Sequence, residues 1–236
     1  MKVSVIIPSF NELKTLPEIL KRISALSIDK EVVVVDDGST DGTREWLELA
    51  VLDRTFPFDL KVIEHAVNKG KGGALVTGFA AATGDVAVIQ DADLEYDPFC
   101  IMEIVKPLIE GGYDVVYGSR MLSGRAETYS ILYLWGNQFL TFLIATLFGV
   151  KMTDSYTCYK AFKTPLVCSL GLVSAGFEIE AEISCKVAYR KYKFVEVPIP
   201  YKPRSRGEGK KINYRDAIKG VRKIFDLRFI SFFRDI

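Results

Sequence analysis

Three acidic residues spaced two apart follow an apolar run near the middle of the chain. Residues 86–89 read VAVI, which predicts a buried strand, and Asp91, Asp93 and Glu95 come directly after it. Extended backbone points alternate side chains the same way, so the three carboxylates are expected to converge. Such a cluster calls for a cation, and Mg²⁺ or Mn²⁺ prefers oxygens from carboxylates, water and substrate phosphate. The simpler alternative is a solvated acidic turn.

Two other predicted strands also end in polar residues. Residues 31–37 read EVVVVDD and close on Asp37, while residues 3–8 are followed by Asn11 and Glu12. Open parallel sheets bind their ligands at the carboxyl ends of the strands, which is where all three polar clusters are expected. Their shared position favours a ligand site over a solvated turn.

Length and composition indicate one α/β domain. The chain has 236 residues, 49% of them hydrophobic, and strand patterns alternate with helical ones. This arrangement predicts a mostly parallel central sheet flanked by helices. The chain opens directly into a strand, so no secretory signal is expected. The four cysteines lack CxxC spacing and there is one histidine, which disfavours a zinc site and fits a reducing, cytoplasmic setting.

Positive charge is concentrated near the end of the chain. Residues 186–236 hold 15 Lys and Arg against 5 Asp and Glu, although the whole chain carries a net charge of +1. We expect a main domain over residues 1–212 and a basic amphipathic helical segment over residues 213–236. That segment either lies at an anionic membrane surface or packs on its own domain with a solvated basic face.

A second stretch also has the composition of a membrane segment. Residues 131–150 are apolar and nearly long enough to cross a bilayer. Asn137 and Gln138 near the middle, and the lack of flanking charges, argue against a true span. An interfacial helix pair or an ordinary core helix fits better.

These segments together resemble family 2 glycosyltransferases with the nucleotide-diphospho-sugar transferase (GT-A) fold. Within that family the chain is similar to the dolichol-phosphate mannose synthase and dolichol-phosphate glucosyltransferase type. The resemblance covers the chain from residue 3 to about residue 225. The stretches that carry it include VSVIIPSFNE, EVVVVDDGSTDGT, NKGKGGALVTGF, IQDADLEYDP, DVVYGSR, TDSYTCYKAF, FVEVPI and PRSRGEGKK.

The resemblance implies a set of nucleotide contacts at the strand ends. The matching positions are Pro8, Phe10, Glu12, Asp37, Lys71, Asp91 and Ala92. A carboxylate at such a position can accept hydrogen bonds from ribose hydroxyls. Residues 69–72 are expected to form a flexible glycine loop that approaches the nucleotide, although a glycine turn before a helix needs no ligand.

The resemblance also assigns the metal and the leaving group. Asp91 and Asp93 match an Asp-X-Asp motif in which the ion bridges the donor diphosphate, and Glu95 is a further candidate ligand. Arg204 and Lys210 match cations that close over the diphosphate, so that Asp93, Arg204 and Lys210 form the expected catalytic set. The alternative for the two basic residues is a solvated charge run.

The acceptor implied by the resemblance is a lipid phosphate. A phosphate monoester is largely anionic near neutral pH, because its second pKa is about 6, and therefore attacks without a general base. Arg120 and Arg125 are the candidate phosphate anchors. A hydroxyl acceptor would need a base, and Glu178 or Glu180 is the candidate for that role or for a sugar contact. Both also fit a helix N-terminal acid cluster.

We therefore expect an inverting, metal-dependent transferase that moves a hexose from a GDP-mannose or UDP-glucose type donor to a polyprenyl or dolichyl phosphate. It is expected to act peripherally at the cytoplasmic face of a membrane, alone or beside a separate membrane protein. Two alternatives remain, transfer to a sugar hydroxyl of a glycan or glycolipid, and a non-catalytic nucleotide-sugar-binding module. The turn PSFNE lacks GxGxxG, which disfavours a dinucleotide oxidoreductase, and no nucleic-acid motif is present.

Overall fold

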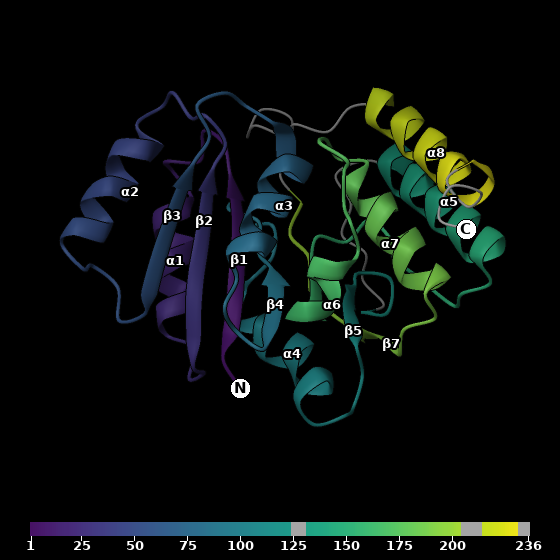
Figure 1. Ribbon diagram of the computed structural model, residues 1–236, viewed down its shortest axis with the longest axis horizontal. Helices are drawn as coiled ribbons and strands as arrows, with labels where there is room; N and C mark the ends of the chain where they lie inside the picture. Colours follow the sequence, from purple (N-terminus) through teal and green to yellow (C-terminus); the bar gives the residue numbers. More distant parts are fainter. Residues whose placement is uncertain (124–130, 204–213, 231–236) are drawn as a thin grey trace.

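A central sheet of seven strands organises the molecule in a computed structural model that describes residues 1–123, 131–203 and 214–230 (Figure 1). Its order is β3-β2-β1-β4-β6-β5-β7. The strands are β1 (Val3–Ser9), β2 (Lys30–Asp36), β3 (Asp59–Glu64), β4 (Val86–Ile89), β5 (Val115–Ser119), β6 (Lys160–Lys163) and β7 (Phe194–Pro198). The expected α/β class with a mostly parallel sheet is confirmed.

The direction of one strand departs from the rest. The pairs β1–β2, β1–β4, β2–β3 and β5–β7 are parallel, whereas β6 runs antiparallel to both β4 and β5. The start of β6 therefore lies at the edge where β4 and β5 end. The loop that leads into β6 reaches the same edge as the loops that leave its neighbours.

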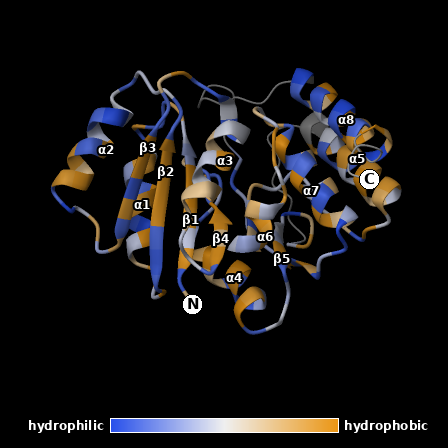
Figure 2. Cartoon of the chain, viewed as in Figure 1, coloured by the Kyte–Doolittle hydropathy of each residue, from blue (hydrophilic) through white to orange (hydrophobic). Residues whose placement is uncertain are grey.

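Helices cover both faces of the sheet, and the strands are hydrophobic on both sides for that reason. Alternate residues separate into two cores, with Val5 and Ile7 facing one and Ile6 facing the other. Figure 2 shows the hydrophobic residues concentrated in β1, β2 and β4. The helices are α1 (Leu16–Ser24), α2 (Thr43–Leu52), α3 (Gly70–Ala81), α4 (Ile101–Ile109), α5 (Ile131–Phe148), α6 (Thr164–Ser169), α7 (Ile179–Tyr189) and α8 (Tyr214–Phe229), with a 3₁₀ turn, η1 (Pro98–Cys100).

A buried carboxylate joins the strands at the edge opposite their carboxyl ends. Glu31, at the start of β2, accepts hydrogen bonds from the Lys2 ammonium at 2.9 Å and from the Thr83 backbone N–H at 2.6 Å. The Ser4 hydroxyl and the Gly84 N–H also donate to it. Burial alone would raise the pKa of Glu31, but these hydrogen bonds lower it to about 2.

Three helices form a separate layer at one end of the molecule (Figure 1). Helices α5, α7 and α8 share a small core that includes Leu140, Ala181 and Ile224. Ile224 of α8 packs into this core, whereas Ile218 and Phe225 of the same helix are exposed. None of the helices in the described ranges combines the length and the apolarity that crossing a bilayer requires.

Candidate functional site

The predicted polar clusters do meet at one edge of the sheet. In the parallel register Ser9 of β1 lies beside Asp36 of β2, and Ile6 of β1 lies beside Ile89 of β4. The N–H of Asp37 also donates to the carbonyl of Ser9 at 2.8 Å. The chain therefore leaves all three strands on the same side, as the parallel sheet requires.

The turn after β1 is fixed by its own side chains. Asn11 adopts a left-handed φ of 53° and its side-chain oxygen accepts the Thr40 N–H at 2.8 Å. Glu12 is buried and accepts the Thr15 hydroxyl at 2.8 Å. Pro8 and Phe10 are half-buried beside this turn. Their expected contacts with a nucleotide stay a prediction.

Asp37 determines where α3 begins. One carboxylate oxygen accepts the Lys69 N–H and the other accepts the Gly70 N–H, both at 2.8 Å, and His65 Nδ1 lies 2.7 Å away. A carboxylate is favourable at a helix N-terminus because the first N–H groups have no partner within the helix. Residues 70–72 therefore belong to the first turn of α3, and the expectation of a flexible loop there is wrong. The predicted ribose contact of Asp37 stays a prediction.

Close packing explains one of the glycines in this turn. A Cβ on Gly72 would lie 2.1 Å from the backbone oxygen of Ser174, so only glycine fits against the segment before α7. The contact brings the start of α3 against the segment before α7 at this edge of the sheet.

Lys71 projects from the first turn of α3 into a buried group of charges. Its Nζ lies 3.0 Å from Asp91, 3.2 Å from Glu180 and 2.9 Å from the sulfur of Cys158. Glu180 also forms an ion pair with Lys160, which is fully buried. Burial alone would lower the pKa of Lys71, but Asp91, Cys158 and Glu180 hold it well above its ordinary value. The ammonium therefore stays charged.

The acidic residues after β4 lie in a turn. The strand ends at Ile89, and Leu94 adopts a left-handed φ of 62° between Asp93 and Glu95. Within the described ranges, no three His, Cys, Asp or Glu side chains are placed to hold a metal ion. The expected convergence of three carboxylates is therefore not seen, because it assumed extended backbone through Glu95.

Glu95 instead joins the turn to the segment after β7. The Tyr201 hydroxyl donates to the Glu95 carboxylate at 2.7 Å, and the Lys202 N–H donates to the Glu95 carbonyl at 3.0 Å. Asp91 and Asp93 remain a suitable donor pair, since Mg²⁺ and Mn²⁺ bind through one or two carboxylates together with substrate phosphates. The metal role of Glu95 stays a prediction. Ala92, between the two aspartates, is buried.

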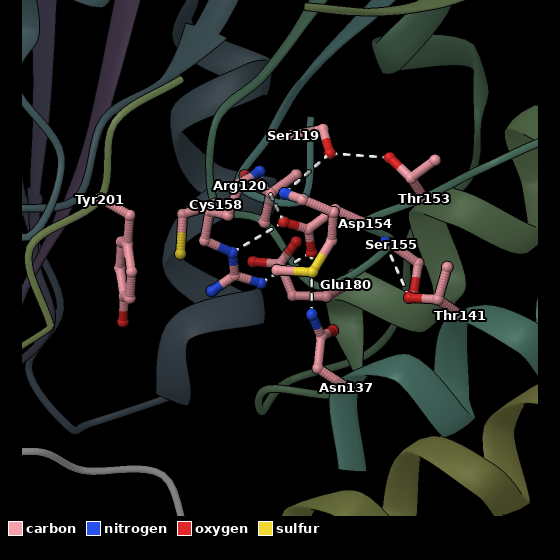
Figure 3. Close-up of polar contacts among 12 residues, drawn as sticks. Ser119, Arg120, Asn137, Thr141, Thr153, Asp154, Ser155, Cys158, Glu180 and Tyr201 are labelled. Carbon is pink, nitrogen blue, oxygen red and sulfur yellow. Dashed lines mark hydrogen bonds and ion pairs between the residues drawn. The ribbon is translucent and has the colours of Figure 1, made fainter. Parts of the chain in front are cut away.

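Arg120 follows β5 and is held in a fixed position (Figure 3). Its guanidinium donates to both carboxylate oxygens of Asp154 at 2.7 Å, and its backbone N–H donates to the same group. Asn137 of α5 donates to Asp154 at 3.0 Å. The guanidinium carbon lies 5.0 Å from the centre of the Tyr201 ring. Burial would raise the pKa of Asp154, but Arg120 and Asn137 lower it.

A second carboxylate supports the loop that carries Asp154. Glu196 of β7 accepts the backbone N–H groups of Thr153 and Asp154 at 2.8–3.0 Å. Sequence reasoning missed Asp154, Tyr201 and Lys160, although Asp154 and Lys160 lie in the quoted stretch TDSYTCYKAF. The available signal was Lys160, a charged residue at the start of the short strand pattern KAF.

The acidic residues near α7 differ in surroundings. Glu180 is buried between two ammonium groups, which favours a charge-balancing role. Glu178 accepts the Gly176 N–H at 3.1 Å, and Glu182 accepts backbone N–H groups of residues 173 and 174. The sugar-contact or base role of Glu178 or Glu180 stays a prediction. Arg125, Arg204 and Lys210 lie outside the described residues.

A match to a family model shows which protein family this chain belongs to. Residues 4–168 match the model described as glycosyl transferase family 2. The chain belongs to this family. The resemblance inferred from the motifs is confirmed, and so is the GT-A fold.

Two curated relatives act on lipid phosphates according to their names. The chain is 36% identical over 215 residues to a dolichol-phosphate mannosyltransferase of Pyrococcus furiosus, a match that covers 89% of this chain and 59% of the relative. It is 35% identical over 169 residues to an undecaprenyl-phosphate 4-deoxy-4-formamido-L-arabinose transferase of Pseudomonas syringae, covering 70% and 48%. The chain thus spans about half to three fifths of the length of these relatives.

The fold is also similar to a solved structure that holds a metal ion, a nucleotide and a glucosylated compound. Glucosyl-3-phosphoglycerate synthase of Mycobacterium tuberculosis, crystallised with Mn²⁺, UDP and glucosyl-3-phosphoglycerate, superimposes with a TM-score of 0.68 at 20% identity, covering 96% of this chain and 80% of that one. Another crystal structure of that enzyme holds Mg²⁺ and UDP. The likeness supports the fold assignment.

Proposed function

We propose that this protein transfers a hexose from a nucleotide diphosphate sugar to a polyprenyl phosphate, with inversion at the anomeric carbon. The observation that carries the proposal is the fixed guanidinium of Arg120 beside the acidic turn of Asp91 and Asp93. Tyr201 contacts both the acidic turn and Arg120, because its hydroxyl donates to Glu95 and its ring lies against the guanidinium. The cation that we propose for the acceptor phosphate is thus linked through Tyr201 to the turn that carries the carboxylate pair proposed for the donor diphosphate.

The reaction breaks the bond between the anomeric carbon and the diphosphate oxygen and forms a bond from that carbon to the acceptor phosphate oxygen. The electron pair of the broken bond leaves with the nucleoside diphosphate. A divalent ion held by Asp91 and Asp93 would supply positive charge to this leaving group. Arg204 and Lys210 are proposed to add to it, and Arg120 orients the acceptor, already anionic near neutral pH.

The donor and the metal are proposed from the relatives. A mannosyltransferase among the relatives and a UDP complex among the structural neighbours fit a GDP-mannose or UDP-glucose type donor. Mn²⁺ and Mg²⁺ in the neighbour structures fit the carboxylate pair of this chain. We propose that Pro8, Phe10, Glu12 and Asp37 lie nearest the nucleoside.

We further propose that the protein meets its acceptor at the cytoplasmic face of a membrane. Trp135, Phe139 and Phe142 are exposed along one side of α5. Helix α8 exposes Ile218 and Phe225 between basic residues. Aromatic side chains beside basic residues suit the interface of an anionic bilayer. A separate membrane protein as partner is a further proposal.

The test compares acceptors and donors in one assay. Purified protein with Mn²⁺ receives GDP-mannose or UDP-glucose and either a polyprenyl phosphate or a free glycan, and product formation is measured. We expect product from the lipid phosphate with one donor. Transfer to the glycan alone would overturn the proposal and make Glu178 the candidate base. Absence of nucleoside diphosphate release with every pair would favour a non-catalytic binding module.

A matched pair of variants tests the acceptor site. Arg120→Gln removes the charge that is proposed to bind the phosphate, whereas Arg190→Gln removes an arginine at the end of α7, outside the site. We expect the KM for the lipid phosphate to rise about tenfold or more in the first variant, because the guanidinium charge proposed to bind the phosphate is lost, and to stay unchanged in the second. An unchanged KM in both variants would contradict the role of Arg120.

A further inference from the structure

A chain of alternating charges runs from the acidic turn to the interior. Asp91 contacts Lys71, Lys71 contacts Glu180, and Glu180 contacts Lys160. The distances from Lys71 Nζ to the two oxygens of Asp91 are 3.0 and 3.2 Å, so the ammonium lies close to both. Lys71 and Asp91 side chains are 11% and 13% exposed. Their attraction is screened by water only weakly.

The ammonium of Lys71 has little room to leave this position. Asp37 holds the backbone of the first turn of α3 through Lys69 and Gly70. The N–H of Gly73 also donates to the carbonyl of Ala175 at 3.1 Å. At its far end the ammonium is held by Glu180 and Cys158 as well as by Asp91.

We propose that Lys71 acts as a built-in counter-cation that weakens divalent metal binding at Asp91 until a nucleoside diphosphate is present. The inference rests on the proposed metal-dependent function and adds a role for a residue that does not ligate the metal. Lys71 would be a positioning residue of the metal site.

The physical reason is the repulsion between two cations that share one carboxylate. A divalent ion on Asp91 would lie close to the fixed ammonium, in surroundings where charges interact much more strongly than in bulk water. A bound diphosphate brings negative charge that offsets both cations. Metal and nucleotide should then strengthen each other's binding, and by linkage the effect is reciprocal.

Glu180 explains why the ammonium can remain in place when Asp91 engages a metal. It balances Lys71 from the opposite side and is itself balanced by Lys160. The loss of the Lys71 charge therefore leaves Glu180 with a partner. For this reason a neutral variant of Lys71 is a better probe than a variant of Glu180, which would strand the fully buried Lys160 without its carboxylate.

The experiment measures Mn²⁺ binding directly, by electron paramagnetic resonance of the free ion, with and without saturating UDP or GDP. The wild type is compared with Lys71→Met, with Lys71→Gln and with Lys69→Met. Lys69 precedes the same helix but its side chain is exposed, so its variant is the matched control. Thermal melting of each protein accompanies the binding data.

We expect Lys71→Met and Lys71→Gln to bind Mn²⁺ alone about tenfold more tightly than the wild type, the size typical of one close charge. The gain from adding nucleotide should shrink in both variants and persist in Lys69→Met. Equal or weaker Mn²⁺ binding by two folded Lys71 variants would overturn the inference. If the wild type binds no Mn²⁺ even with UDP or GDP, the proposed metal-dependent function fails as well.

Discussion

At the scale of single residues, neighbouring acidic side chains have different partners. Asp91 contacts the ammonium of Lys71, whereas Glu95 accepts the hydroxyl of Tyr201. Asp93 lies between them and accepts the N–H of Glu95 at 3.1 Å. A sequence pattern of alternating acids therefore does not make three equivalent ligands. Asp91 and Asp93 are the pair on which we place the metal.

Replacement of one ligand should abolish transfer. Asp93→Asn keeps the size of the side chain but removes its charge, so the leaving diphosphate would lose its metal. We expect no measurable transfer and an unchanged melting temperature, with Asp53→Asn at the exposed end of α2 as control. Turnover near that of the wild type, or indifference of the wild type to EDTA, would contradict the metal assignment.

A second prediction concerns a basic residue outside the described ranges. If Arg204 stabilises the departing diphosphate, Arg204→Ala should lower kcat by roughly a hundredfold, as the removal of one such electrostatic group does. Arg206→Ala in the same segment is the comparison. A loss of only a few fold in steady-state turnover, equal in both variants, would indicate a solvated charge run.

At the scale of elements, the buried carboxylate of Glu31 joins the starts of β1 and β2 to the segment before β4. Its side chain is 5% exposed, and its hydrogen-bond donors hold its pKa near 2 in the folded protein. The folded pKa is depressed, so the stabilisation is present above the unfolded pKa of 4.5 and is lost as pH falls toward 2.

The variant Glu31→Gln should remove most of that stabilisation. The shift in pKa corresponds to about 3 kcal/mol, so we expect the free energy of unfolding at pH 7 to fall by roughly 2–4 kcal/mol. Urea titrations from pH 7 to pH 3 should show a flatter pH dependence than in the wild type. Glu48→Gln, an exposed change on α2, should leave the curve unaltered. A wild-type stability that is equally high at pH 3 and pH 7 would contradict this account.

The elements show how far the sequence predicts the fold and where it stops. The strands β1, β2 and β4 were predictable because runs of apolar, largely β-branched residues have few other stable arrangements in an α/β protein. The meeting of their polar ends followed from the parallel sheet. The start of α3 could not be predicted in this way, because its capping group is Asp37, which lies 33 residues before Gly70 in the chain. The turn at Leu94 and the Arg120–Asp154 pair depend on tertiary contacts in the same way.

At the scale of the whole molecule, charge and exposed aromatic residues lie together on the layer of α5, α7 and α8. The exposed side of α5 carries Trp135, Phe139 and Phe142, and that of α8 carries Arg215, Lys219 and Arg222. The rest of α8 packs inward through Ile224. The sequence suggested either a helix at a membrane surface or a helix packed on its own domain. In the structure α8 packs on its own domain and still presents a basic surface, which a membrane could contact.

We predict salt-dependent binding of the protein to anionic vesicles. Co-sedimentation should be strong at low ionic strength and weaken above about 0.1 M, where charges more than about 10 Å apart are screened. The variant Lys219→Glu with Arg222→Glu should lose most of the binding, and Phe142→Ser should weaken binding that remains at high salt. Lys106→Glu, on the exposed side of α4, is the control. Equal binding to neutral and anionic vesicles would contradict an electrostatic contribution.

The reversed strand β6 has a consequence for the order in which the protein assembles during synthesis. Strands β1 to β4 can pair with one another in the order β3-β2-β1-β4 as they leave the ribosome, and the other edge of β4 waits for β6. The paired neighbours of β5 in the described sheet are β6 and β7, so β5 must wait for residues that are translated later. The loop that carries Asp154 and Cys158 arrives with β6. A nascent chain that ends before residue 160 would therefore carry Asp37 and Asp91 without the wall of the site that Asp154 and Cys158 complete in the folded protein.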